Sequence, residues 1–203
     1  MELKYAKYLK VSMEEVMLKE TIDALEGREV EVLEIPGAYL SADMDKKVHI
    51  VFIGALAEMM VAADPALYQS FVSYETGKAV LYVRLHKALY GCLKSALMFY
   101  EKLVGDLEAY GFRINTYNLC VTNTMVGGKQ ITVCWNMDDL NISCIDANEV
   151  TKMIHWLESE YGEIHGSHGK RHYYLVMWLN YSIPREVRIS MEEYLRGVLN
   201  NFP

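Results

Sequence analysis

Two adjacent carboxylates, Asp138 and Asp139, separate an apolar run that ends at Trp135 from one that begins at Leu140. Neighbouring residues of a regular strand point to opposite faces, but a tight turn can direct both carboxylates toward one point. Their mutual repulsion there would be relieved by a divalent cation. Because Asn and Asp are also favoured in hairpin turns, the pair alone leaves a purely structural interpretation open.

A third carboxylate, Glu34, stands at the end of a predicted strand over 29–33, directly before Ile35-Pro36-Gly37. If it faces the Asp138-Asp139 turn across a sheet, three carboxylates from two neighbouring strands would hold two Mg²⁺ ions for phosphoryl transfer. One ion would activate an attacking hydroxyl and the other would neutralise the leaving group. The alternative is that Glu34 is an ordinary exposed edge residue.

Other chemistry-bearing residues give weaker patterns. The spacing of His165, His168 and His172 could chelate zinc, but the intervening glycines favour a polar loop. The sequence contains neither a GxSxG motif nor a P-loop motif. The four cysteines, at 92, 120, 134 and 144, form no CxxC pair, so buried reduced thiols are favoured over zinc or disulfides.

The elements that must position these residues follow from local signals. Capping boxes predict three helix starts, at Ser12 with Glu15, Asp146 with Glu149, and Ser190 with Glu193. Gly27 and Gly162 predict the ends of the first two, and a fourth helix is predicted over 94–110.

Runs typical of strands lie at 29–33, 48–53, 79–85, 119–126, 131–135, 140–145, 172–179 and 187–189. Hairpins are predicted at Gly127-Gly128 and over 136–139. The pattern predicts an α+β fold, in which an antiparallel sheet is backed by helices.

The 203 residues are 52% hydrophobic and 23% charged, which excludes a disordered or low-complexity chain. The 27 acidic and 20 basic residues give a net charge of −7, which argues against a nucleic-acid binder. The charge is uneven, however, because residues 1–45 are net −6 and residues 78–100 are net +4. That basic segment is either a solvated face or a phosphate-contacting surface.

The apolar runs at 50–53 and 55–63 are far shorter than the ~20 residues of a membrane span. The first five residues lack the apolar core of a signal peptide, so we expect an intracellular protein without membrane contact.

Three segments in one order, at 34–40, 87–100 and 135–140, resemble Ty1/copia-type reverse transcriptases of LTR retrotransposons. The segment 173–182 resembles a later strand motif of that family. The resemblance covers residues 12 to 203 and rests on the order and spacing of four motifs.

The resemblance implies an RNA-directed DNA polymerase. The implied fold is a polymerase palm, a ferredoxin-like split βαβ sheet with partial fingers. Residues 1–203 would form a single palm-like domain, without the N-terminal part of the fingers, the thumb or the RNase H domain. The implied partners are an RNA or DNA template-primer, a dNTP, and the integrase and RNase H domains of the parent polyprotein. The implied location is a cytoplasmic retrotransposon particle or the nucleus.

The resemblance also assigns roles to residues. Glu34, Asp138 and Asp139 match the catalytic metal ligands, for Mg²⁺ or alternatively Mn²⁺. Tyr39 matches the aromatic residue under the incoming sugar. Lys87, Gly91 and Lys94 lie in the segment that contacts template and nucleotide.

The chain departs from the family pattern at several positions. Glu34 replaces an aspartate, Asn136 an aromatic residue or histidine, Val176 a glycine, and Asn118 a common aspartate. Two-metal geometry tolerates little displacement. An alternative is therefore a catalytically impaired remnant that only binds nucleic acid or a partner protein. A further alternative is another metal-dependent phosphoryl-transfer enzyme, such as a nucleotide cyclase.

Overall fold

The computed structural model describes residues 10–92 and 94–202 and shows an α+β fold with antiparallel sheets. The chain divides into two compact units. The first comprises Met1–Ala38 and Phe99–Pro203, and the second is Tyr39–Met98. The single-domain organisation over residues 1–203 stays a prediction.

The first unit is built on a six-stranded antiparallel sheet, as the sequence predicts. Its strand order is β5-β6-β7-β8-β1-β9. The strands are β5 (Arg113–Ile114), β6 (Val121–Val126), β7 (Lys129–Asn136), β8 (Asp139–Cys144), β1 (Glu29–Glu34) and β9 (His165–Ser167). Both predicted hairpins are confirmed, because Val126 pairs with Lys129 and Asn136 pairs with Asp139.

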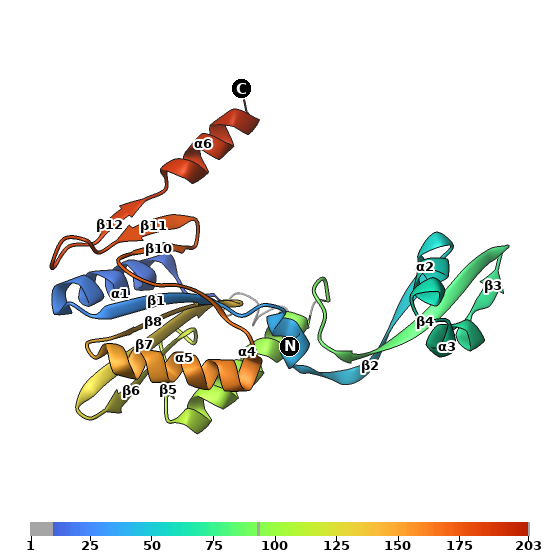
Figure 1. The fold of residues 1–203 in the computed structure, drawn as a ribbon, viewed down its shortest axis with the longest axis horizontal. Coiled ribbons are helices and arrows are strands. Elements are labelled where there is room, and N and C mark those ends of the chain that lie inside the picture. Colours follow the sequence, from blue (N-terminus) through green and yellow to red (C-terminus); the bar gives the residue numbers. More distant parts are fainter. Residues whose placement is uncertain (1–9, 93, 203) are drawn as a thin grey trace. The chain divides into compact units, whose positions relative to one another are not determined.

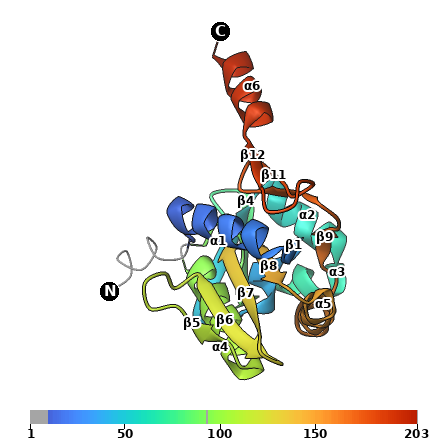
Figure 2. The ribbon, with the colours of Figure 1, turned by 90° about the vertical axis from the view of Figure 1, so that its left-hand side faces the viewer.

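Helices lie on both faces of this sheet (Figures 1 and 2). One face carries α1 (Met13–Glu26), and the other carries α4 (Ser95–Tyr110) and α5 (Ala147–Tyr161). The predicted start and end of α1 are confirmed: the Ser12 side chain accepts from the Glu15 backbone N–H, and Gly27 adopts φ 66°. Asp146 also caps α5, but its side chain accepts from the Asn148 N–H, two residues on, instead of from Glu149.

The core of the first unit lies between the sheet and helices α4 and α5. Side chains of β7 and β8 on this face are at most 1% exposed, and they are Ile131, Val133, Trp135, Leu140 and Ile142. Burial of one such side chain contributes roughly 1.5–3 kcal/mol. The β7–β8 hairpin is therefore held firmly, and with it the turn that carries Asp138. None of the four cysteines, all within the described ranges, forms a disulfide; three are buried and Cys92 is half-buried.

A small antiparallel sheet follows, of β10 (Arg171–Tyr174), β11 (Met177–Asn180) and β12 (Arg188–Ser190). The prediction of one strand over 172–179 is wrong. Leu175 and Val176 adopt φ of 50° and 62° and form a two-residue turn, which pairs Tyr174 with Met177. The apolar character of the turn residues hides the turn from a sequence pattern.

The last helix, α6 (Glu192–Asn201), also differs from its prediction. Its N-cap is Met191, which makes no side-chain cap hydrogen bond. Ser190 ends β12 instead, and its hydroxyl accepts from the Glu192 N–H at 3.3 Å.

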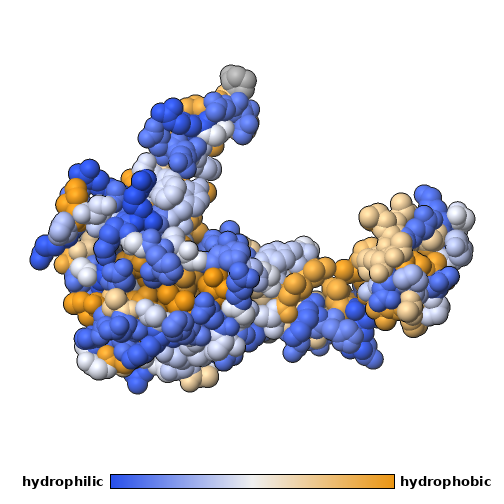
Figure 3. Space-filling model, in the orientation of Figure 1, coloured by the Kyte–Doolittle hydropathy of each residue, from blue (hydrophilic) through white to orange (hydrophobic). Residues whose placement is uncertain are grey.

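The second unit contains an antiparallel sheet of order β2-β4-β3, formed by β2 (Asp43–Ile53), β4 (Lys78–Lys87) and β3 (Ser73–Glu75). It also holds the short helices η2 (Ala38–Ser41), which begins at the boundary, α2 (Ala55–Ala63), α3 (Pro65–Tyr68) and η3 (Gln69–Phe71). Ala57 of α2 packs against Ala79 and Leu81 of β4. Many apolar side chains of this unit remain exposed, as the hydrophobic colouring in Figure 3 shows.

None of the helices within the described ranges combines the length and apolar character needed to cross a bilayer. The prediction about a signal peptide concerns residues that lie outside the described ranges.

Candidate functional site

The ends of β1 and β8 bring Glu34 and Asp139 together. The two strands pair antiparallel with Glu34 directly opposite Asp139, and the Ile35 N–H donates to the Asp138 carbonyl at 3.1 Å. Directly opposed residues point to the same face, with Cβ atoms ~4.5–5.5 Å apart. The structure therefore places Glu34 across the sheet from the acidic turn.

Met137 and Asp138 form the two-residue turn between β7 and β8, because Asn136 pairs with Asp139. Met137 adopts φ 60°, a conformation that side chains other than glycine seldom take. Such backbone strain persists only where the surroundings enforce it, here the buried hairpin, and it is concentrated at functional sites. The turn presents Asp138 directly before Asp139.

All three carboxylates line one open cavity of about 630 Å³ within the first unit. Asn136 lines it beside them, β9 contributes His165, and the β10–β11 turn contributes Leu175 and Val176. The cavity is thus bordered by strand ends and turns, which leaves room for a ligand beside the carboxylates.

Negative charge is crowded at this edge. Burial, followed by the charges of Asp138 and Glu34, raises the pKa of Asp139 to about 6. Within the described part of the chain, neither the Glu34 nor the Asp139 side chain has a cationic partner. A bound cation would relieve this repulsion.

The carboxylates of Glu34, Asp138 and Asp139 are suitable ligands for Mg²⁺, because that ion binds carboxylate oxygens. The described residues contain no group of three His, Cys, Asp or Glu side chains already gathered around one point. Mg²⁺ is commonly held by one or two carboxylates with substrate phosphates and water as the other ligands, so this arrangement fits a substrate-dependent site.

His165 lies beside Glu34, although the sequence suggested it as a zinc ligand together with His168 and His172. It pairs with Glu34 from β9, on the side opposite Asp139. The other two histidines lie elsewhere: His168 contacts Glu31 at 3.0 Å, and the buried His172 contacts Ser167 at 2.9 Å. In the described ranges the three histidines share no metal site. Only the register of β9 identifies His165 as a neighbour of Glu34.

The predicted nucleotide- and template-contacting residues belong to the second unit. Tyr39 stacks on Tyr90, with ring centroids 4.2 Å apart and planes at 28°. Gly91 adopts φ 87°, which favours glycine. Their predicted contacts with substrate stay predictions.

Two of the basic side chains in this unit are paired within it. Lys87 lies 2.7 Å from Asp43 and Lys94 lies 3.1 Å from Asp45. The net charge of +4 counted over residues 78–100 therefore overstates the positive charge available to phosphates.

A network of buried charges, which the sequence did not reveal, fixes α1 on the face of the sheet that carries Glu34 and Asp139. Lys19 Nζ lies 2.6 Å from Asp23 and 2.5 Å from Asn141 of β8, and Ser143 of β8 donates to Asp23 at 2.7 Å. Burial lowers the pKa of Lys19, but Asp23 and Glu20 outweigh it and hold that pKa above its ordinary value. The one feature of this network visible in the sequence is the spacing of four residues between Lys19 and Asp23, which places both on one face of a helix.

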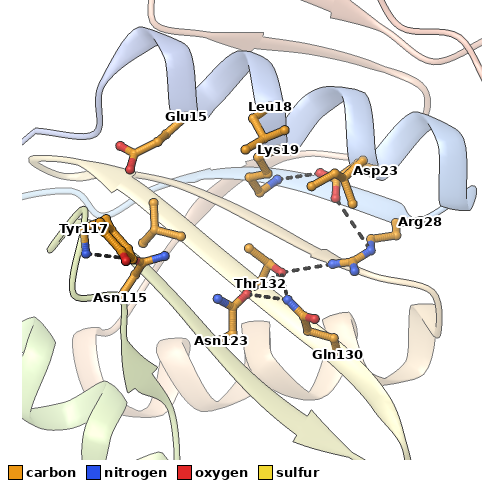
Figure 4. A pocket seen from close by; sticks show the side chains of 12 residues that line it. Glu15, Leu18, Lys19, Asp23, Arg28, Asn115, Tyr117, Asn123, Gln130 and Thr132 are labelled. Atoms are coloured by element: carbon orange, nitrogen blue, oxygen red, sulfur yellow. Dashed lines mark hydrogen bonds and ion pairs between the residues drawn. The ribbon is translucent and has the colours of Figure 1, made fainter.

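A second cavity, of about 340 Å³, opens beside this network between α1 and strands β6 and β7 (Figure 4). Three of its charged groups, Lys19, Asp23 and Arg28, are paired within it: Asp23 lies 2.6 Å from Lys19 and 3.8 Å from Arg28, and Arg28 also donates to Thr132 at 3.0 Å. The network therefore positions α1 and leaves the three carboxylates as the candidate chemical site.

Comparison with known proteins adds little to this geometry. No protein-family model matches the chain, and no curated protein matches it. The chain is similar to a solved structure of apo telomerase from Candida tropicalis truncated from the C-terminal domain, with 10% identity and a TM-score of 0.49. The match covers 88% of this chain and 40% of that one. At this TM-score the likeness assigns neither family nor activity, and the resemblance to Ty1/copia enzymes stays a prediction.

Proposed function

We propose that this chain carries the catalytic face of an RNA-directed DNA polymerase of the Ty1/copia type. The observation that carries the proposal is that Glu34 and Asp139 oppose each other on paired strands while Asp138 lies in the adjoining turn, all lining one cavity. The ordered sequence motifs support it, because they assign these same three residues to one site.

In this proposal Glu34, Asp138 and Asp139 hold Mg²⁺ or Mn²⁺, which supplies charge neutralisation for phosphoryl oxygens and acidifies the attacking hydroxyl. The carboxylates must be ionised to do so. Because the pKa of Asp139 is raised to about 6, its negative charge is lost on mild acidification. The template-primer and dNTP are the substrates, and Tyr39 is the residue that the sequence resemblance assigns to the incoming sugar. Integrase and RNase H domains are the partners, in a cytoplasmic particle or the nucleus.

Primer extension on an RNA template, with dNTPs and either Mg²⁺ or Mn²⁺, tests this function. Asp138→Asn should abolish extension, whereas Glu160→Gln, which removes one exposed carboxylate of α5, should leave it unchanged. Extension that survives Asp138→Asn would refute the assigned site.

A second candidate is a non-catalytic palm-like module that binds nucleic acid or a partner protein. It is favoured by Glu34, one methylene longer than aspartate, and by the lack of a gathered three-ligand group among the described residues. Glu34→Asp separates the two candidates. Gain of extension in this variant supports a polymerase with a weakened site, and nucleic-acid binding without any gain supports the binding module.

A further inference from the structure

Glu31 of β1 is a buried carboxylate, and one of its oxygens has no partner among the described residues. Its side chain is 8% exposed, and its Oε1 accepts from His168 Nδ1 at 3.0 Å. Its Oε2 is sealed from solvent and makes no hydrogen bond with any residue in the described ranges. A buried charged acceptor without a donor is costly, so a group that donates to Oε2 would be bound favourably.

Glu31 lines a cavity of about 300 Å³ between β1 and α5. Two further carboxylates, Glu29 and Glu158, also line it, and Lys170 neutralises only Glu29, at 2.9 Å. The two imidazoles at the cavity are His155 and His168. Its remaining walls include the apolar side chains of Ala147, Val150 and Ile154. The cavity thus combines an excess of acidic groups with an aliphatic wall.

We propose that this cavity binds an alkylammonium group, whose N–H groups donate to Glu31 and whose methylene chain lies along Val150 and Ile154. An ammonium supplies three donors and no acceptor, which matches a carboxylate with one oxygen that lacks a donor among the described residues.

In this proposal His168 is the competitor of the ammonium. Its side chain is 78% exposed, so rotation away from Glu31 would move the ring into solvent rather than against buried groups. The imidazole and the ammonium then compete for the same carboxylate. Glu31 faces α5, whereas Glu34 faces α1, so the two sites lie on opposite faces of the sheet. The inference therefore does not rest on the proposed polymerase activity.

Isothermal titration calorimetry of the full chain at pH 7.5 tests the inference with two amines, 1,4-diaminobutane and Nα-acetyl-lysine N-methylamide. The uncharged control is 1,4-butanediol. We expect saturable binding of an amine and none of the diol, and the tighter amine identifies a free diamine or a peptidyl lysine as the source. Glu31→Gln should weaken binding about 10-fold or more. Glu160→Gln should leave it unchanged, and His168→Ala should strengthen it by removing the competitor.

Several outcomes would overturn the inference: no saturable amine binding up to about 10 mM, equal binding of the diol, or weaker binding in His168→Ala. Should Glu31→Gln fail to fold, Glu158→Gln alters an exposed helix position and should still weaken binding. Amine affinity that is unchanged in the folded Glu31 or Glu158 variant also contradicts the proposed site.

Discussion

Replacement of Lys19 by Met removes a buried ammonium while keeping most of the side-chain length. Lys19 is 6% exposed, and its Nζ contacts Asp23 at 2.6 Å and Asn141 at 2.5 Å. Glu20, fully buried, lies 3.9 Å away. The variant therefore leaves two buried carboxylates without their nearest cation.

Removal of one partner from a buried ion pair costs about 3–5 kcal/mol. Asp23 keeps the Ser143 hydroxyl at 2.7 Å and Arg28 at 3.8 Å. Because these contacts still satisfy part of its charge, we expect the lower end of the range, a loss of about 3 kcal/mol in the free energy of unfolding.

Urea unfolding at pH 7, followed by tryptophan fluorescence, measures this loss by linear extrapolation. Trp135, 1% exposed in the core of the same unit, reports the transition. Lys152→Met is the matched control, because it removes an exposed lysine from an ion pair of 2.5 Å with Glu149. Its stability should equal that of the wild type. A loss below about 1 kcal/mol for Lys19→Met, or equal losses in both variants, would refute a structural role for the network.

Two further predictions concern the sheet edge. The Asp139 carboxyl should titrate near 6 by NMR rather than at its ordinary 3.8, and Asp138→Asn should lower that pKa. Since the folded pKa exceeds the unfolded one, the folded state binds more protons in this window, and stability should fall as pH rises from about 4 to about 6. Asp139→Asn should reduce this dependence, and an unchanged pH profile would contradict the assignment. Gly166→Ala would place a Cβ 2.7 Å from Leu33 Cδ2 and should cost about 1–3 kcal/mol in urea unfolding. Unaltered stability would show that Leu33 moves aside freely.

Much of the local structure is predictable from the sequence because its causes are local. The cap at Ser12 depends on residues three positions apart, and Gly27 ends α1 through its own backbone conformation. The hairpin at 136–139 likewise follows from polar turn residues between two apolar runs. These signals located Asp138 and Asp139 in a turn at the end of a core hairpin.

Features that depend on distant residues were not predictable. His165 lies beside Glu34 only because β9 pairs with β1, and no local pattern specifies that register. In the sequence, Lys19 has the features of an ordinary surface residue of a helix, and its burial follows only from the packing of α1 on Asn141, more than a hundred residues away. The pairing of Lys87 with Asp43 similarly required the β2–β4 register.

The central claim is that Glu34, Asp138 and Asp139 act together on a divalent cation. Titration of the full chain with Mn²⁺, followed by electron paramagnetic resonance with and without a dNTP, measures this directly. We expect Mn²⁺ binding that the dNTP strengthens and that Asp139→Asn weakens about 10-fold or more, with Glu160→Gln unchanged. Equal Mn²⁺ binding by the wild type and Asp139→Asn would contradict the account.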